Sequence, residues 1–148
     1  MFTIIASSII YPEIILRSSI SIASNLITSL NYLISISKND IELQSLLDIV
    51  EDINIMKAFI DEKQEERCYG KVFGKTVGMC ISNLNETLLQ LEKNINSISE
   101  KMQNHKLKWF AKFRSYDIED EKKLIPILTE QMRYKFELLL KVSGNLDS

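Results

Sequence analysis

The chain has 148 residues, of which 45% are hydrophobic and 26% are charged, and its formal net charge is −2. This length suits a single domain over residues 1–148 and is enough to bury a sizeable core. The near-neutral charge predicts no general attraction to nucleic acid. The scarcity of glycine (4) and proline (2) disfavours an all-β fold with many tight turns.

The N-terminal quarter of the chain is almost uncharged. Its first 38 residues carry only three charged side chains: Glu13, Arg17 and Lys38. Pro12 suits the first turn of a helix, where a missing N–H costs nothing. The expected first helix therefore covers residues 12–37. Its apolar positions fall mostly on one face: Ile15, Ile22, Leu26, Leu30 and Leu33.

This segment also has the length of a membrane span. About half of residues 18–37 are Ser, Thr or Asn, so we do not expect a constitutive transmembrane helix. Residues 1–11 form either an extra helical turn or a loose apolar arm, and they lack the basic start of a signal peptide. The sequence favours a cytoplasmic protein.

A second helix is expected after Ser37, Asn39 and Asp40, which can cap its N-terminus. Its apolar stripe follows three- and four-residue steps: Leu43, Leu46, Val50, Ile53, Met56 and Ile60. An acidic face lies largely outside that stripe: Asp48, Glu51, Asp52 and Glu62. The pattern fades at residues 61–67, which are expected to form frayed helix or loop.

The third helix has the most regular pattern. Its apolar residues are spaced 4-3-4-3-4-3-4 without exception: Val77, Ile81, Leu84, Leu88, Leu91, Ile95, Ile98 and Met102. Residues at this spacing share one side of a helix and form a packing seam. The seam could pair copies of the chain in a coiled coil, but three other amphipathic helices favour packing within one chain.

Three glycines precede or open this helix at four-residue spacing: Gly70, Gly74 and Gly78. If helical, they allow close approach of a neighbouring backbone. The alternatives are a flexible helix start or a glycine seam used in a membrane assembly. The stretch GKVFGKT also resembles a phosphate-binding loop, but it is one residue too short between its glycines and follows no strand pattern.

The fourth helix is expected to begin near residues 119–121, whose acidic side chains favour a helix N-terminus. Its predicted stripe has five members: Leu124, Leu128, Met132, Phe136 and Leu139. Pro126 is expected to kink the helix or to mark its true first turn, and Gly144 to cap its end. The prediction is an all-α antiparallel bundle of four main helices, with a short basic-aromatic segment before the last.

No residue pattern points to catalysis. His105 is the only histidine, with no cysteine at metal-ligand spacing. Cys68 and Cys80 are expected to be free thiols in a reducing compartment. No nucleophile–base arrangement is supported by spacing. We therefore expect no enzyme activity, no catalytic residue, no metal and no cofactor.

The basic-aromatic segment lies just before the fourth helix. Its cations and rings interleave: Lys106, Lys108, Trp109, Phe110, Lys112, Phe113 and Arg114. Such a segment offers cations to anionic headgroups and rings to a bilayer interface. The alternatives are aromatic plugging of one end of the bundle, or contact with protein or RNA.

Two stretches resemble the N-terminal helical domain of mixed-lineage kinase domain-like proteins, fungal HeLo domains and plant resistance-protein coiled-coil domains. Residues 44–62, QSLLDIVEDINIMKAFIDE, are similar to the second helix of those domains. Residues 91–140 are similar to their third helix, basic-aromatic break and fourth helix. The chain differs from this family in its first two helices, which carry more basic residues in the family than they do here.

The resemblance implies a cell-death or immune effector that oligomerises with itself and permeabilises an anionic phospholipid membrane at the plasma membrane. Residues 1–33 would insert, and residues 106–114 would contact lipid. The alternative is a soluble adaptor or decoy. It would bind a helical protein partner through the third-helix seam or the acidic face.

Overall fold

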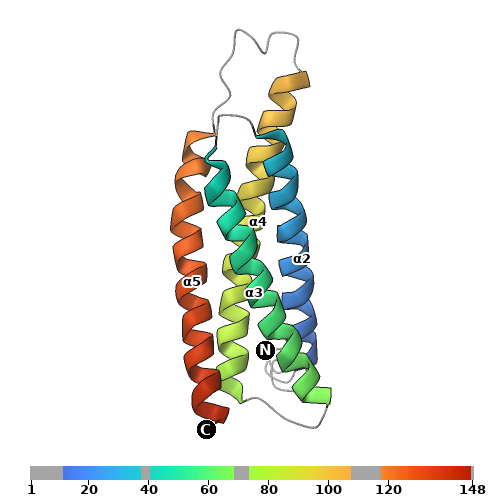
Figure 1. Cartoon of the computed structure of the whole chain (residues 1–148), viewed down its shortest axis with the longest axis vertical. Helices are drawn as coiled ribbons and strands as arrows, with labels where there is room; N and C mark the ends of the chain where they lie inside the picture. Colours follow the sequence, from blue (N-terminus) through green and yellow to red (C-terminus); the bar gives the residue numbers. More distant parts are fainter. Residues whose placement is uncertain (1–11, 38–40, 69–73, 108–117, 148) are drawn as a thin grey trace, which may run out of the picture.

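The computed structural model describes residues 12–37, 41–68, 74–107 and 118–147. Over these ranges the chain forms four helices and no strand. The helices are α2 (Pro12–Ile36), α3 (Leu43–Cys68), α4 (Lys75–Leu107) and α5 (Glu119–Asp147). Consecutive helices run in opposite directions along one long axis (Figure 1). The predicted all-α bundle of four helices is therefore confirmed.

The order of the helices around the bundle differs from their order in the chain. α2 packs against both α3 and α4, and α4 packs against both α2 and α5. α3 and α4 are consecutive in sequence but hardly touch, and α3 crosses in front of α4 in Figure 1. α3 and α5 meet at only a few points. The bundle is thus tightly closed along α2 and α4 and more open between α3 and α5.

The buried stripe of α2 keeps one regular register. Its positions repeat at three- and four-residue steps: Leu16, Ser19, Ala23, Leu26, Leu30 and Leu33. Ile15 and Ile22, which were expected on this face, are only half-buried and flank the stripe. The alternation of three and four keeps a single seam against the neighbouring helices, and Ile15 and Ile22 lie outside it.

The buried stripe of α3 also differs from the predicted one. Its members are Leu46, Ile49, Ile53, Met56, Ile60 and Lys63. Leu43 is 46% exposed, so the prediction was wrong for this position, whereas Val50 is half-buried and packs against the core. The register that buries Ile49 turns Leu43 outward and leaves Val50 at the edge of the stripe.

The helix α3 continues to Cys68, so the prediction of frayed helix or loop at residues 61–67 was wrong. Lys63 occupies a stripe position and is 7% exposed. Its ammonium lies 5.4 Å from the Phe59 ring centroid and 3.2 Å from Glu66 Oε2. A long stem can be buried while its charge finds a ring and a carboxylate, and Glu, Lys and Gln all favour helix. A charged residue therefore continues the stripe where the apolar pattern ends.

The seam of α4 is buried along its whole length, from Val77 to Met102. Because α4 packs against α2 and α5, this seam lies in the core of a single chain. Burying each such side chain contributes about 1.5–3 kcal/mol. The seam is therefore a major source of stability, and its side chains are covered in this fold.

The helix α5 differs from its prediction in three places. It begins at Glu119 with Pro126 inside it, so Pro126 does not mark the first turn. Leu124 is 43% exposed, and Ile125, which is 5% exposed, takes its place in the core. The helix continues past Gly144 to Asp147, so Gly144 is not its cap. Pro126 lies on an exposed face of the helix, and it leaves the Lys122 carbonyl without its usual helical donor.

Candidate functional site

The predicted lipid-contact segment falls mostly outside the described residues. The backbone of Lys106 belongs to the last turn of α4, and residues 108–117 are not described. Gly70 is also outside the described ranges. Gly74 precedes α4 and is exposed, and its carbonyl accepts a hydrogen bond from the Gly78 N–H at 3.2 Å. Gly74 therefore lies exposed at the start of α4, and the close approach of a neighbouring backbone to these glycines stays a prediction.

The outward face of α2 forms a second regular stripe, which is polar and uncharged. Its exposed positions are spaced 4-3-4-3: Ser21, Asn25, Thr28, Tyr32 and Ser35. Thr28 Oγ1 donates to the Ser24 carbonyl at 3.1 Å, and Ser35 Oγ donates to the Tyr32 carbonyl at 2.6 Å. These two hydroxyls are satisfied by their own helix, whereas the Tyr32 hydroxyl donates to Gln103 Oε1 of α4 at 3.3 Å. We call these five residues the polar stripe of α2.

A buried polar contact holds α2 against α4. The Ser19 hydroxyl donates to Asn85 Oδ1 at 2.5 Å and lies 3.0 Å from the Ile15 carbonyl oxygen. Ser19 is fully buried and Asn85 is 9% exposed. A polar pair inside an apolar seam fixes the relative position of two helices, because any shift leaves a buried oxygen without a donor.

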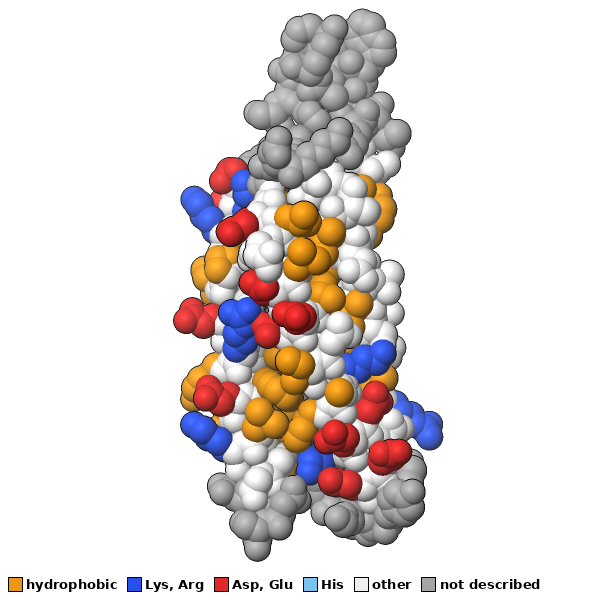
Figure 2. Space-filling view, viewed as in Figure 1, with side chains coloured by type: hydrophobic (Ala, Val, Ile, Leu, Met, Phe, Trp, Pro, Cys, Tyr) orange, Lys and Arg blue, Asp and Glu red, His pale blue; other side chains and the backbone are white. Residues whose placement is uncertain are grey.

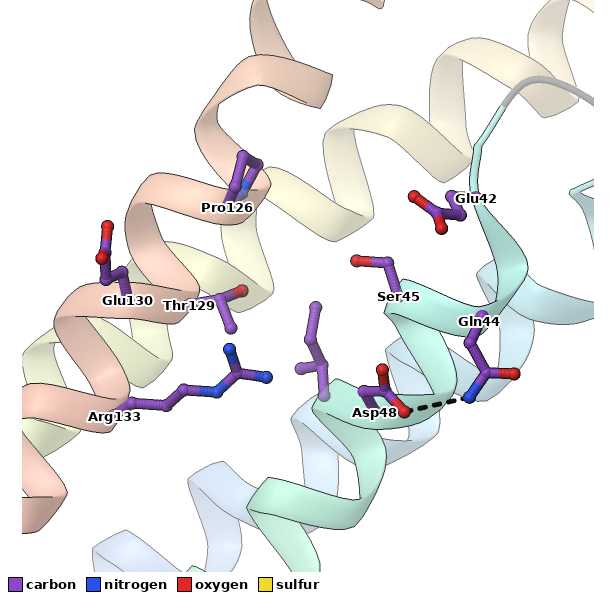
Figure 3. A pocket seen from close by; sticks show the side chains of 9 residues that line it. Glu42, Gln44, Ser45, Asp48, Pro126, Thr129, Glu130 and Arg133 are labelled. Carbon is purple, nitrogen blue, oxygen red and sulfur yellow. Dashed lines mark hydrogen bonds between the residues drawn. The ribbon is translucent and has the colours of Figure 1, made fainter.

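Two adjacent hollows lie between α3 and α5, which do not pack closely against each other. The first has a volume of about 450 Å³ and is lined by Asp48 and Ile49 from α3 and by Pro126 and Glu130 from α5. Figure 3 shows Arg133 extending across this hollow from α5 towards α3. The second, of about 320 Å³, also includes Arg133. We call the two hollows together the α3–α5 groove, lined by residues 42–56, at and just before the start of α3, and by α5 residues 126–140.

Two contacts bridge the α3–α5 groove. Arg133 Nε donates to Asp52 Oδ2 at 2.7 Å. The rings of Phe59 and Phe136 meet edge to face, with centroids 5.6 Å apart and planes at 86°. Beside these contacts Ile55 is 61% exposed and Leu140 is 41% exposed. Figure 2 shows hydrophobic side chains gathered between α5 and the lower half of α3, with charged side chains above them.

The charge of the α3–α5 groove is mainly acidic. The side chains lining it include five carboxylates: Glu42, Asp48, Asp52, Glu130 and Glu137. Arg133 is the single cation in these linings and is already paired with Asp52. The sequence predicted the acidic face of α3 but not its position beside an apolar gap.

A polar cluster ties the start of α5 to α4. The Asn94 side-chain amide donates to the Glu121 carbonyl at 2.8 Å, and the Glu121 carboxylate accepts from Lys101 and, at 3.4 Å, from Ser97. The hydrogen bond from Lys101 is the main cause that lowers the pKa of Glu121. The cluster ties the first turn of α5 to the C-terminal part of α4.

The described residues contain no group of three or more His, Cys, Asp and Glu side chains placed to hold a metal ion. Cys80 is buried and forms no disulfide. No family model, curated protein or solved structure matches the chain. The resemblance to the cell-death helical domains therefore stays a prediction from sequence pattern. The features available for function are surfaces: the polar stripe of α2 and the α3–α5 groove.

Proposed function

We propose that this chain is a non-enzymatic effector domain that oligomerises and permeabilises anionic membranes by inserting α2. The observation that carries the proposal is the combination of length, composition and exposure in this helix. Residues Ile15–Ile36 are long and apolar enough to cross a membrane, the single such helix in the described part of the chain. Only 28% of its most apolar window is buried in the bundle.

The energetics restrict where α2 can go. Four of its leucines, Leu16, Leu26, Leu30 and Leu33, are fully buried. Exposing four such side chains to water costs about 6–12 kcal/mol, which is comparable to the whole stability of a typical domain. Release into water would therefore unfold the bundle. Transfer into a bilayer keeps these side chains out of water and removes most of that cost.

The polar stripe of α2 supports self-association in the membrane. Ser, Thr and Asn side chains are poor lipid contacts but form hydrogen bonds between membrane helices. Their 4-3-4-3 spacing aligns them on one side of the helix, so inserted copies could pair through that side. The resemblance adds the setting, a cytoplasmic cell-death or immune protein recruited to the plasma membrane.

The test is leakage of a trapped dye from vesicles of phosphatidylcholine and phosphatidylserine. The informative variant carries Asn25→Lys and Thr28→Lys, two exposed positions in the middle of α2. Each lysine near the centre of a spanning helix opposes insertion by about 2.5–3.5 kcal/mol. We expect this variant to bind the vesicles but to release little dye.

The matched control adds the same two charges elsewhere, with Asn96→Lys on α4 and Gln131→Lys on α5, both exposed. It should release dye at least as well as the unchanged chain, since added cations strengthen attraction to anionic lipid. No leakage from the unchanged chain would reject the proposal. Equal leakage from the two variants would show that α2 does not insert.

The alternative, a soluble adaptor that binds another helical protein, is favoured by the α3–α5 groove. Of the two surfaces considered for this role, the α4 seam is covered within the chain, whereas the acidic face of α3 borders an open apolar gap. An adaptor would bind its partner without releasing dye from vesicles.

A further inference from the structure

We infer that the α3–α5 groove binds a cationic amphipathic helix of another protein. This inference is independent of membrane insertion, because it uses the side of the bundle away from the α2–α4 contact. Three properties of the groove carry it: its shape, its apolar floor and the sign of its charge.

The shape of the groove fits a helix. Along α5 it extends from Pro126 to Leu140 at three- and four-residue steps, a length of about 21 Å at the rise of an α-helix. A ligand helix of about four turns matches this length, and such helices bind with apolar residues at positions i, i+3, i+4 and i+7. The two hollows on either side of Arg133 would receive successive anchors.

The floor of the groove is apolar and incompletely covered. Met56 is buried and Phe136 is half-buried beneath it, and Ile55 and Leu140 stay substantially exposed at its edge. A ligand that covers Ile55 and Leu140 removes their apolar surface from water, which supplies a driving force for docking. Phe136, which lines this floor, also makes the edge-to-face contact with Phe59 of α3.

The charge of the groove selects the partner. Five carboxylates line it against one arginine, and that arginine already pairs with Asp52. A ligand with lysine or arginine beside its apolar stripe complements this rim, whereas an acidic helix is repelled. A symmetric pair of copies joined through this face would place acidic groove against acidic groove. The charge therefore favours a different, cationic chain as the occupant.

The probe is a fluorescent model peptide, LKKLLKLLKKLLKL, with its acidic counterpart LEELLELLEELLEL as the control ligand. Anisotropy titrations of the intact protein should show saturable binding of the cationic peptide, weaker at high salt, and none of the acidic one. The groove variant carries Asp48→Lys and Glu130→Lys, both at exposed positions. We expect it to bind the cationic peptide at least about tenfold more weakly.

The matched control variant carries Glu92→Lys and Glu100→Lys on α4, away from the groove. It changes the net charge equally and should alter affinity less than about twofold, because distant exposed charges are screened. A third variant, Ile55→Ser, keeps the charge and should also weaken binding, which separates apolar docking from simple charge attraction. Circular dichroism would verify that each variant remains helical.

Three results would overturn the inference: no binding of the cationic peptide, equal loss in the groove and control variants, or full affinity in Ile55→Ser. Dimers of the unchanged chain that the groove variant abolishes, measured by sedimentation, would also overturn it and assign the groove to a second copy. The outcome is separable from membrane insertion. Variants of the groove should release dye at least as well as the unchanged chain, and Asn25→Lys with Thr28→Lys should leave peptide binding unchanged.

Discussion

The two sides of this bundle are built differently. Between α2 and α4, leucine and isoleucine side chains at regular three- and four-residue steps meet along most of both helices, with one buried polar pair, Ser19 and Asn85. Between α3 and α5 there are few contacts, one ion pair, one aromatic contact and two hollows. The first side is far more extensively packed than the second, which leaves apolar and acidic surface available.

This difference in packing indicates which side suits membrane insertion and which suits ligand binding. The buried side chains of α2 can leave α4 only if another apolar environment replaces it. Membrane insertion of α2 would supply such an environment. An open side can accept a ligand without disturbing the core, because the surface it covers is already exposed. The following changes test the comparison.

The largest effect on stability is expected from a truncation on the packed side. Leu84→Ala on α4 removes a fully buried side chain and should lower the free energy of unfolding by about 2–5 kcal/mol. Leu140→Ala, at a position 41% exposed beside the α3–α5 groove, should cost less than about 1 kcal/mol. Urea unfolding measures both values. Similar losses at the two positions would contradict the contrast between the two sides.

Under the proposed membrane function, we expect the basic-aromatic segment before α5 to meet lipid first. Reversing Lys106, Lys108, Lys112 and Arg114 to Glu should abolish binding to anionic vesicles in a flotation assay, since each cation contributes about 1 kcal/mol near such a surface. Helicity should be retained. Unchanged vesicle binding would move the first contact to α2, and loss of helicity would mean that the segment is packed in the bundle.

The buried polar pair gives an intermediate effect. Ser19→Ala removes the hydroxyl that donates to Asn85 Oδ1, and the unpaired buried oxygen should cost about 1–3 kcal/mol. Adding Asn85→Leu removes that oxygen, so the double variant should recover most of the loss. A double-mutant cycle in urea measures the coupling. Simple additivity of the two changes would show that the contact does not hold α2 against α4.

The sequence predicted the four helices well because the residues that favour helix ends and the spacing of apolar residues are local properties. Its best prediction was the α4 seam, where most residues on either side are polar and the apolar spacing is unbroken. The stripes of α2 and α3 were partly wrong for a physical reason. Isoleucines next to the seam, such as Ile15 and Ile22, create overlapping three- and four-residue patterns. Only packing against neighbours selects the register that buries Ser19 and Lys63.

The α3–α5 groove could not be predicted from periodicity. Its existence depends on which helices are neighbours, and consecutive helices α3 and α4 turn out to lie across the bundle from one another. The acidic residues Asp48 and Asp52 were recognised as an exposed face. Nothing in the sequence indicated that Arg133, 81 residues further along than Asp52, would reach across to that face.

The smallest expected effect concerns Glu121, at the junction of α4 and α5. Because Lys101 lowers the pKa of this carboxyl in the folded state, its charged form stabilises the fold above the pH at which the unfolded chain titrates. That contribution is lost as the pH falls through the lowered pKa of the folded state. Glu121→Gln should therefore reduce the free energy of unfolding by about 0.5–1 kcal/mol at neutral pH, and the difference should vanish in acid.

Urea unfolding of both chains at neutral and acidic pH measures this pH dependence. The control is Glu137→Gln, an exposed carboxylate on the same helix whose loss should change stability by no more than about 0.5 kcal/mol. If Glu121→Gln were as harmless as the control at neutral pH, the ion pair with Lys101 would not anchor α5. The start of that helix would then depend on the Asn94 hydrogen bond to the Glu121 carbonyl and on burial of Ile125.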